Sequence, residues 1–192
     1  IREIVLSLRT FSRLDEADMK EVDIHEGLDS TLLILQNRLK AKPDHPAIQV
    51  IKEYGNLPKV ECYPGQLNQV FMNILANAID ALEEYNKKRS PIEIKTNPNT
   101  ITIHTQIIGN EPKNINNKIL IRIADNGLGM TEEVRKRLFN PFFTTKPVGK
   151  GTGLGLAISY QIIVEKHQGN ITCNSEPGQG AEFAIEIPIR QS

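Results

Sequence analysis

The stretch that decides the fold opens with Asp125-Asn126-Gly127-Leu128-Gly129-Met130 and closes with Gly149-Lys150-Gly151-Thr152-Gly153-Leu154-Gly155-Leu156. Between these glycine clusters lies the segment Phe139-Asn140-Pro141-Phe142-Phe143-Thr144-Thr145-Lys146. Residues 131–150 carry five basic and two acidic side chains, a net +3 (five minus two), whereas the whole chain has a formal charge of zero. Glycines permit unusual backbone dihedrals, and N–H groups at the start of a helix attract phosphate. The stretch therefore predicts a mobile flap over a phosphate-bearing ligand.

Composition narrows the class of protein. The chain has 192 residues, of which 39% are hydrophobic and 24% charged, values typical of a globular domain with a substantial core. Its neutral charge provides no field that would attract nucleic acid or anionic membrane, so we expect no nucleic-acid partner. No apolar run approaches the ~20 residues that span a bilayer. Cys62 and Cys173 lie singly in alternating apolar stretches, which predicts two buried free thiols in a reducing compartment.

The most informative helix is predicted over Gln66 to Glu84. Eight apolar residues form one wide face: Leu67, Val70, Phe71, Ile74, Leu75, Ala78, Ile79 and Leu82. A polar stripe runs along the other side: Gln66, Gln69, Asn73, Asn77, Asp80 and Glu84. Asparagine is a poor helix former, and a solvated face would more cheaply use Glu or Lys. We therefore predict that this stripe faces a ligand.

The remaining pattern predicts an α+β two-layer sandwich, a mixed sheet with helices on one face. A strand start is expected at Val22 to Ile24 and a helix from about 26 to 41, ended by Pro43. Residues 48–54 and 59–62 predict two strands joined by a turn at Gly55-Asn56. Further strands are expected at 91–95, 100–108 and 118–124, the last two forming a hairpin. A short helix at 131–138 capped by Thr131, a helix at 155–166 and a closing hairpin of 170–175 and 181–187 complete the pattern.

The first residues belong to a different unit. Ile1, Ile4, Leu8 and Phe11 follow the 3-4 spacing of a coiled-coil seam, although a single amphipathic helix packed on its own domain would read the same way. Asp15 to Lys20 is a charged hinge. We therefore predict two units: residues 1–20, a helix remnant with its hinge, and residues 21–192. Because the chain begins with Ile1, we expect it to be a fragment.

Taken alone, each motif also has an ordinary structural interpretation. Asp125, at the end of a strand and followed by glycines, suits recognition of an exocyclic amine, but an Asp-Asn-Gly turn would look the same. The glycines 149–155 suit phosphate binding, or a flexible hinge loop. They do not match a Walker loop, because Gly-Lys is not followed by Ser or Thr at the right spacing, and they do not match a dinucleotide fingerprint, because no strand leads into them. The basic segment between the clusters reads either as phosphate-facing or as a solvated face, with its phenylalanines fastening it to the core.

In this order, the motifs together resemble the ATP-binding domain of sensor histidine kinases. The asparagine stripe, Asp125-x-Gly127-x-Gly129, Phe139-x-Pro141-Phe142-Phe143 and Gly151-x-Gly153-Leu154-Gly155-Leu156 are similar to that family's asparagine, first glycine, phenylalanine and second glycine boxes. The resemblance covers about 21–190 and implies the Bergerat-type ATP-binding fold. Residues 1–20 look like the end of the family's dimerisation and phosphotransfer domain.

The resemblance also implies a site. ATP and Mg²⁺ would be bound, with Asn77 holding the metal and Asn73 contacting phosphate or ribose. Asp125 would take the adenine amine, with Gly127 beside it and Gly129 and Met130 lining the ring. Lys146 would reach the β- and γ-phosphates and, with Asn73, would be a catalytic residue. The remaining phosphate contacts would come from Lys150, Gly151, Thr152, Gly153, Leu154, Gly155 and Leu156.

The implied reaction is transfer of the γ-phosphoryl group to a histidine nitrogen, for relay to a response-regulator aspartate. Two departures from the family's pattern matter. Ala181 stands where the family carries Ser or Thr, which removes one water-mediated contact to adenine. His25-Glu26 begins like a phosphoacceptor motif, but Asp29-Ser30 follow instead of Asn/Thr-Pro, and His45, His104 and His167 lack the motif. We therefore expect the acceptor upstream of Ile1.

The full-length protein is expected to form a homodimer through its upstream helices and to act with a response-regulator receiver domain. We expect this fragment to be soluble and cytoplasmic, with a parent either soluble or membrane-anchored. One alternative is another ATPase of the same superfamily, which would carry a glutamate base where Asn73 stands. A non-catalytic nucleotide-sensing module and a related serine kinase remain as further alternatives.

Overall fold

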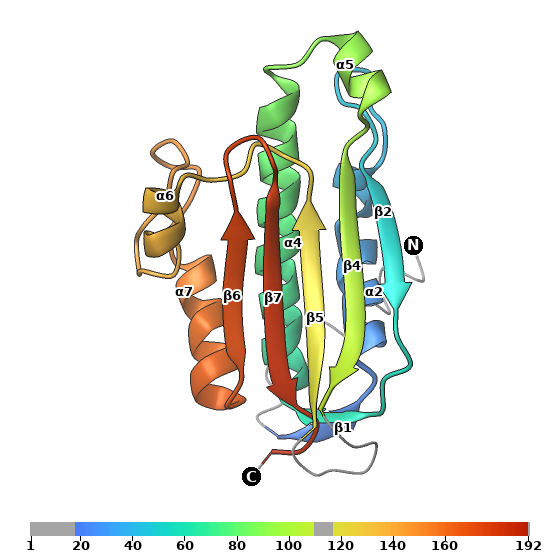
Figure 1. Cartoon of the computed structure of the whole chain (residues 1–192), viewed down its shortest axis with the longest axis vertical. Helices are drawn as coiled ribbons and strands as arrows, with labels where there is room; N and C mark the ends of the chain where they lie inside the picture. Colours follow the sequence, from blue (N-terminus) through green and yellow to red (C-terminus); the bar gives the residue numbers. More distant parts are fainter. Residues whose placement is uncertain (1–17, 110–116, 192) are drawn as a thin grey trace.

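The computed structural model describes residues 18–109 and 117–191. In these ranges a five-stranded sheet has the order β2-β4-β5-β7-β6. Its strands are β2 (Gln49–Tyr54), β4 (Thr100–Ile108), β5 (Lys118–Asp125), β7 (Ala181–Pro188) and β6 (Asn170–Ser175). β2 runs parallel to β4, and the other neighbouring pairs are antiparallel. Helices lie on one face of this mixed sheet (Figure 1), which confirms the predicted α+β two-layer architecture.

The helices follow from local sequence signals. They are α2 (Ile24–Ile34), α3 (Gln36–Leu39), α4 (Pro64–Asn86), α5 (Pro91–Thr96), α6 (Glu132–Arg137) and α7 (Gly155–Tyr160), which continues as the π-helix η2 (Gln161–Lys166). Asp23 caps α2, and Thr131 caps α6 as predicted. The predicted hairpins β4-β5 and β6-β7 and the predicted helix at 155–166 are confirmed. The predicted coiled-coil residues Ile1 to Phe11 lie outside the described residues.

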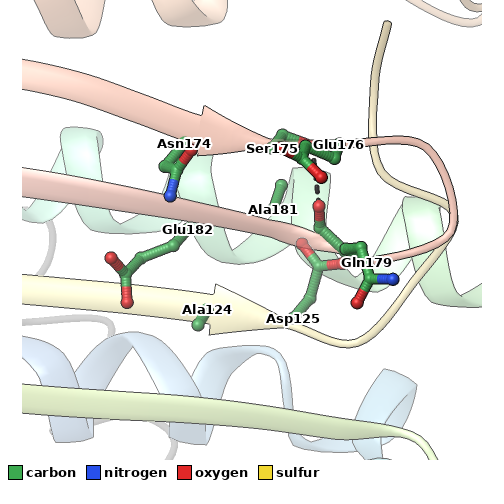
Figure 2. A pocket seen from close by; sticks show the side chains of 9 residues that line it. Ala124, Asp125, Asn174, Ser175, Glu176, Gln179, Ala181 and Glu182 are labelled. Atoms are coloured by element: carbon green, nitrogen blue, oxygen red, sulfur yellow. Dashed lines mark hydrogen bonds between the residues drawn. The ribbon is translucent and has the colours of Figure 1, made fainter.

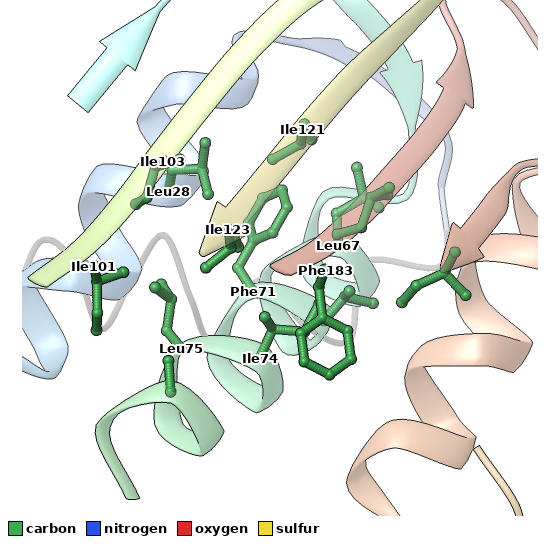
Figure 3. Packing of buried hydrophobic residues seen from close by; sticks show 14 of the residues in the cluster. Leu28, Leu67, Phe71, Ile74, Leu75, Ile101, Ile103, Ile121, Ile123 and Phe183 are labelled. Carbon is green, nitrogen blue, oxygen red and sulfur yellow. The ribbon is translucent and has the colours of Figure 1, made fainter. Parts of the chain in front are cut away.

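The long helix α4 organises the core. All eight residues of its predicted apolar face are buried against the sheet and α2. Figure 3 shows Phe71, Ile74 and Leu75 of α4 in one cluster with Ile123 and Phe183 from the strands. Each such side chain contributes ~1.5–3 kcal/mol by leaving water. α4 is therefore fixed along the middle of the sheet, and its polar stripe is held in a defined direction.

The strands predicted at 48–54 and 59–62 are both present, but they do not pair with each other across the turn at Gly55-Asn56. β2 pairs in parallel with β4, whereas β3 (Val60–Cys62) pairs with β1 (Lys20–Val22) in a separate two-stranded sheet. The N–H of Gly55 donates to the hydroxyl of Thr105 at 3.0 Å, so the chain leaves β2 along β4 instead of turning back. Both partners are distant in sequence, and a local pattern does not reveal them.

The strand predicted at 91–95 is also wrong, because this segment forms helix α5. Ser90 and Glu93 make a capping box, with each side chain bonded to the other residue's backbone N–H. Pro91 occupies the first helical turn, where its missing N–H costs nothing. The alternation of Ile92 and Ile94 suggested a strand, but Ile92 is 77% exposed. The capping signal outweighs the alternation.

The expected helix from about 26 to 41 begins earlier and is broken once. Asp23 accepts from the N–H of His25 at 2.9 Å, so α2 begins at Ile24 where a strand had been expected to continue. A turn at Leu35 separates α2 from α3, which ends at Leu39.

Cys62 and Cys173 are buried free thiols, as predicted, and burial raises the pKa of each to about 12. No helix within the described ranges is long and apolar enough to cross a bilayer.

Candidate functional site

The polar stripe of α4 meets the segment between the glycine clusters, which we call the lid (residues 139–153). Lys146 of the lid donates from Nζ to Oδ1 of Asn77 at 3.1 Å and to Oδ2 of Asp80 at 2.5 Å. The side chains of Lys146 and Asp80 are 35% and 34% exposed. The middle of the stripe is therefore not a solvated face, since it binds a cationic group of the lid.

Arg38 of α3 also binds the carboxylate of Asp80, through the oxygen that Lys146 does not use. Its Nη2 donates to Oδ1 of Asp80 at 2.6 Å and to Oε2 of Glu83 at 2.9 Å. Burial alone would raise the pKa of Asp80, but the hydrogen bonds from Lys146 and Arg38 outweigh this effect and hold the pKa below its usual value. Sequence reasoning missed Arg38, which lies 42 residues from Asp80 and belongs to no motif.

Asn73 joins α4 to the second glycine cluster. Its Nδ2 donates to the carbonyl oxygen of Gly155 at 2.9 Å and to Oγ of Ser159 at 3.1 Å. The hydroxyl of Ser159 in turn donates to the same carbonyl at 2.9 Å. Asn73 thus holds the first turn of α7 against α4. A direct contact of Asn73 with phosphate or ribose stays a prediction.

Asp125 ends β5 with its carboxylate among buried groups. The residue is 9% exposed, and its Oδ1 accepts from the N–H of Gly127 at 2.8 Å. Burial raises the pKa of Asp125 to about 6, although hydrogen bonds from the N–H groups of Gly127 and Ala181 act in the opposite direction. Asp125 belongs to the same buried row as Ile121 and Ile123, which faces α4, and Gly127 lies against Ala81 of that helix. An amine donor entering between β5 and α4 would meet a desolvated carboxylate.

The first glycine cluster is held by the β6–β7 turn. Gly129 has a φ of +69°, and a Cβ there would collide with the carbonyl oxygen of Glu176. The N–H of Met130 donates to Oγ of Ser175 at 2.9 Å, and that hydroxyl donates to the carbonyl oxygen of Gly180 at 2.6 Å. Ser175 is a site-supporting residue that sequence reasoning missed. Its place opposite Ala181 in the β6–β7 register was the available signal.

The lid is anchored by Phe139. Its ring lies 5.6 Å from that of Tyr160 on α7 and 6.5 Å from that of Phe183 on β7. Phe143 stacks under the guanidinium of Arg137 at 4.5 Å. Phe142 was expected to help fasten the lid, but it is 76% exposed with a φ of +64°, which corrects that prediction. Gly153 packs so closely on the backbone of Phe142 that a Cβ would collide with it.

The remaining predicted phosphate contacts are spread along the lid and the start of α7. Gly151 lies against the side chains of Thr144 and Lys146. Lys150 is near enough to Glu84 to help lower the pKa of that carboxyl, after the larger effect of Lys87. Thr152 accepts from the N–H of Leu154 at 3.3 Å, and Leu156 packs against the core. The basic end of the lid therefore lies over the C-terminal half of α4.

A hollow of about 390 Å³ lies elsewhere, at the ends of β5, β6 and β7 (Figure 2). Among its lining residues, Ala124, Asn174 and Glu182 alternate with buried residues, so they belong to the sheet face that carries no helices. Asp125 also lines this hollow, although its place in the row of β5 that faces α4 puts it on the same face as the lid. The other predicted ligand residues are not among its lining residues, so the hollow reaches one end of the predicted site but not the space between α4 and the lid.

The side chain of His25 is held in place by neighbouring side chains. Its Nε2 is 2.8 Å from Oγ1 of Thr105, and its ring stacks on Tyr54 at 4.1 Å with an interplanar angle of 3°. His167 is fully buried between Ile162 and Tyr63. His104 lies 3.3 Å from a carboxylate oxygen of Glu53. That the phosphoacceptor is none of these histidines stays a prediction.

Comparison with known proteins gives a consistent family. The profile described as histidine kinase-, DNA gyrase B-, and HSP90-like ATPase matches residues 62–191. Sporulation kinase E of Bacillus subtilis is 41% identical over 137 residues, covering 71% of this chain and 16% of that protein. The signal transduction histidine-protein kinase AtoS of Escherichia coli is 34% identical over 191 residues, covering 98% of this chain and 27% of that protein. This chain thus spans under a third of the length of either relative.

Solved structures show the same fold. The catalytic domain of the histidine kinase ThkA, in a nucleotide-free form, superposes with a TM-score of 0.67 at 26% identity, covering 89% of this chain and 95% of that one. Full-length ShkA in complex with AMPPNP superposes with a TM-score of 0.70 at 25% identity, covering 98% of this chain and 36% of that one.

Proposed function

This chain belongs to the histidine kinase-, DNA gyrase B-, and HSP90-like ATPase family, and from that premise we propose that it is the ATP-binding catalytic domain of a sensor histidine kinase. One observation carries the proposal. The lid brings Lys146 into direct contact with Asn77 in the middle of α4, and Asn73 fixes the glycine-rich start of α7 one turn away. An amide oxygen, a lysine ammonium and a helix N-terminus then converge where a nucleotide triphosphate needs them.

Adenine would enter between β5 and α4. The carboxylate of Asp125 would accept from its exocyclic amine, and the backbone around Gly127 and Gly129 leaves room for the ring. Met130, tied to Ser175, would form one wall. The relative solved with AMPPNP supports a nucleotide of this kind. A buried acceptor of this type rejects a base that offers a carbonyl instead of an amine, because two acceptors would then face each other.

The residues present also fit a magnesium ion. Mg²⁺ prefers oxygen donors, few of them from the protein, with phosphate oxygens and water completing the shell. Asn77 supplies an amide oxygen, and Asp80 places a carboxylate one turn further along the helix. A cation already fits there, since the ammonium of Lys146 lies between the two side chains. Asn77 would hold the ion, which would neutralise charge on the triphosphate.

The proposed reaction transfers the γ-phosphoryl group to a histidine nitrogen in a preceding helical domain. The bond from the γ-phosphorus to the bridging oxygen breaks, a P–N bond forms and ADP leaves. The protein's contribution is positioning and charge neutralisation, here by Lys146, Lys150 and the N–H groups of residues 153–156. We further propose that the full-length protein dimerises through helices preceding this domain and passes the phosphoryl group to a response regulator.

ATP hydrolysis is the competing function within the family. It requires a base that activates water, and in this structure Asn73 stands one helical turn before Asn77. An amide cannot accept a proton near neutral pH, and its nitrogen is already committed to Gly155 and Ser159. These contacts favour phosphoryl transfer to another nucleophile over rapid hydrolysis.

Isothermal calorimetry with ATP and MgCl₂ tests the proposal. We expect binding in the micromolar range or weaker, negligible turnover, and at least ~10-fold weaker binding for Asn77→Ala, because a charge-assisted contact is worth ~1.5–3 kcal/mol. Asn86→Ala, at the far end of the same helix, is a matched control and should bind like wild type. Absence of ATP binding by wild type, or Asn77→Ala binding as tightly as wild type, would contradict the proposal.

A further inference from the structure

We propose that Asp80 is a latch residue that holds the lid over the proposed nucleotide site by keeping Lys146 on α4, and that ATP must displace this pair to bind. The inference rests on the proposed function, since Lys146 is there a phosphate ligand. It adds to that function a second, opposing role for the same side chain.

The geometry gives Lys146 two mutually exclusive positions. Its ammonium now lies between Oδ1 of Asn77 and Oδ2 of Asp80. That is where the proposed metal ligand presents its only oxygen, so the ammonium occupies the cation's place. A lysine has one charged group, which cannot remain on Asp80 and also move to the phosphates. Occupation of the site by nucleotide and release of Asp80 are thus one event.

Arg38 lowers the free-energy cost of moving Lys146 from Asp80 to the phosphates. The two carboxylate oxygens of Asp80 are divided between the partners, Oδ1 with Arg38 and Oδ2 with Lys146. When Lys146 leaves, Arg38 still neutralises the carboxylate, so no unpaired charge remains in a half-buried position. Because all three side chains are about one third exposed, losing one pair shifts the equilibrium by only a few-fold. Asp80 and Arg38 are therefore positioning residues, and the latch is weak enough for a nucleotide to open.

The two partners of the latch should respond differently to mutation, and this provides the test. Hydrogen exchange of the nucleotide-free chain is followed by mass spectrometry in peptides covering 139–153, for wild type, Asp80→Asn and Lys146→Gln. Either variant breaks the ion pair, so we expect lid exchange to be about threefold faster in both. Glu83→Gln is the matched control, since Glu83 also binds Arg38 but does not contact Lys146. Its lid should exchange like that of wild type.

Binding of ATP in EDTA then separates the roles. Asp80→Asn should bind about three- to tenfold more tightly, because the latch is gone and one negative charge near the triphosphate is removed. Lys146→Gln should bind about tenfold more weakly, because it loses a phosphate contact. A merely structural ion pair would not be expected to give opposite changes in ATP affinity together with equal increases in lid exchange in the nucleotide-free chain.

Unchanged lid exchange in Asp80→Asn would overturn the latch, as would weaker ATP binding by that variant. If Asp80→Asn folds poorly by circular dichroism, Lys146→Gln breaks the same pair from the exposed side and decides the lid arm alone. Faster lid exchange in both variants, with no ATP binding by wild type, would support the latch while refuting the proposed function. The two failures are thus distinguishable.

Discussion

Replacing Asp125 by asparagine should stabilise the nucleotide-free chain while weakening its binding of ATP. The structure buries this carboxylate and raises its pKa from 3.8 to about 6. A shift of about two pKa units corresponds to ~3 kcal/mol between the two protonation states at neutral pH. Asparagine removes the charge but brings an amide that cannot accept from both Gly127 and Ala181 as well as the carboxylate does. We therefore expect a net gain of ~1–2 kcal/mol in the free energy of unfolding at pH 7.5.

The pH dependence provides a sign check. A carboxyl whose folded pKa lies above its unfolded value binds more protons in the folded state, so its favourable contribution is complete below pH ~4 and is lost as pH rises through about 6. The advantage of Asp125→Asn over wild type should therefore be largest above pH 7 and disappear near pH 4. Urea unfolding followed by circular dichroism at pH 4.5 and 7.5 measures this difference, and the chain has no tryptophan for a fluorescence assay.

The functional half of this prediction has the opposite sign. A hydrogen bond to a charged acceptor is worth ~1.5–3 kcal/mol, so Asp125→Asn should bind ATP ~10–100-fold more weakly. A variant that is less stable than wild type at pH 7.5, or whose advantage does not shrink toward pH 4.5, would refute the reasoning about the buried charge. Unchanged ATP affinity would refute the role in adenine recognition.

Two further predictions concern the lid and the buried histidine. Gly153→Ala should loosen the lid and weaken ATP binding several-fold, because its Cβ would collide with the Phe142 backbone. Gly149 also has a positive φ, +84° against +69° for Gly153, but has open space around it, so Gly149→Ala should cost only ~1 kcal/mol of local strain. Lid proteolysis after Lys150 and ATP titrations compare the two variants. His167 accepts from the N–H of Tyr63 at 3.0 Å, and burial lowers its pKa. Its stabilising effect should be present above pH ~6.5 and be lost as pH falls below that value. The free energy of unfolding of wild type minus that of His167→Gln, measured with urea, should therefore decrease as the pH is lowered from 7 to 5. A flat difference would contradict this.

Local sequence signals predicted most of the helices and their ends. The apolar face of α4 was predicted correctly because a helix that packs one face against a sheet repeats its apolar residues with the period of the helix, whichever sheet it packs on. Thr131 and the glycine clusters likewise act on their immediate neighbours, whereas the cap at Asp23, which begins α2 at Ile24, was not predicted. Where two local signals competed, as in α5, the capping box of Ser90 and Glu93 outweighed an apolar alternation. That information was present in the sequence but was given too little weight.

Strand pairing and the environment of each polar group were different. The parallel pairing of β2 with β4 joins segments about 50 residues apart, and no local pattern specifies a partner at that distance. The sequence suggested that Asn77 and Lys146 serve one ligand, but not that their side chains contact each other.

The sequence by itself thus determined the order of the motifs, the family's fold and the residue types of the candidate site, because these depend on short spacings along one helix or loop. Only the tertiary structure decided that Arg38 and Lys146 share Asp80, that Asn73 holds Gly155, and that Phe142 points to solvent. Ion pairs, carboxylate desolvation and lid contacts are set by distances between segments that folding brings together, and those distances are not encoded in any one segment.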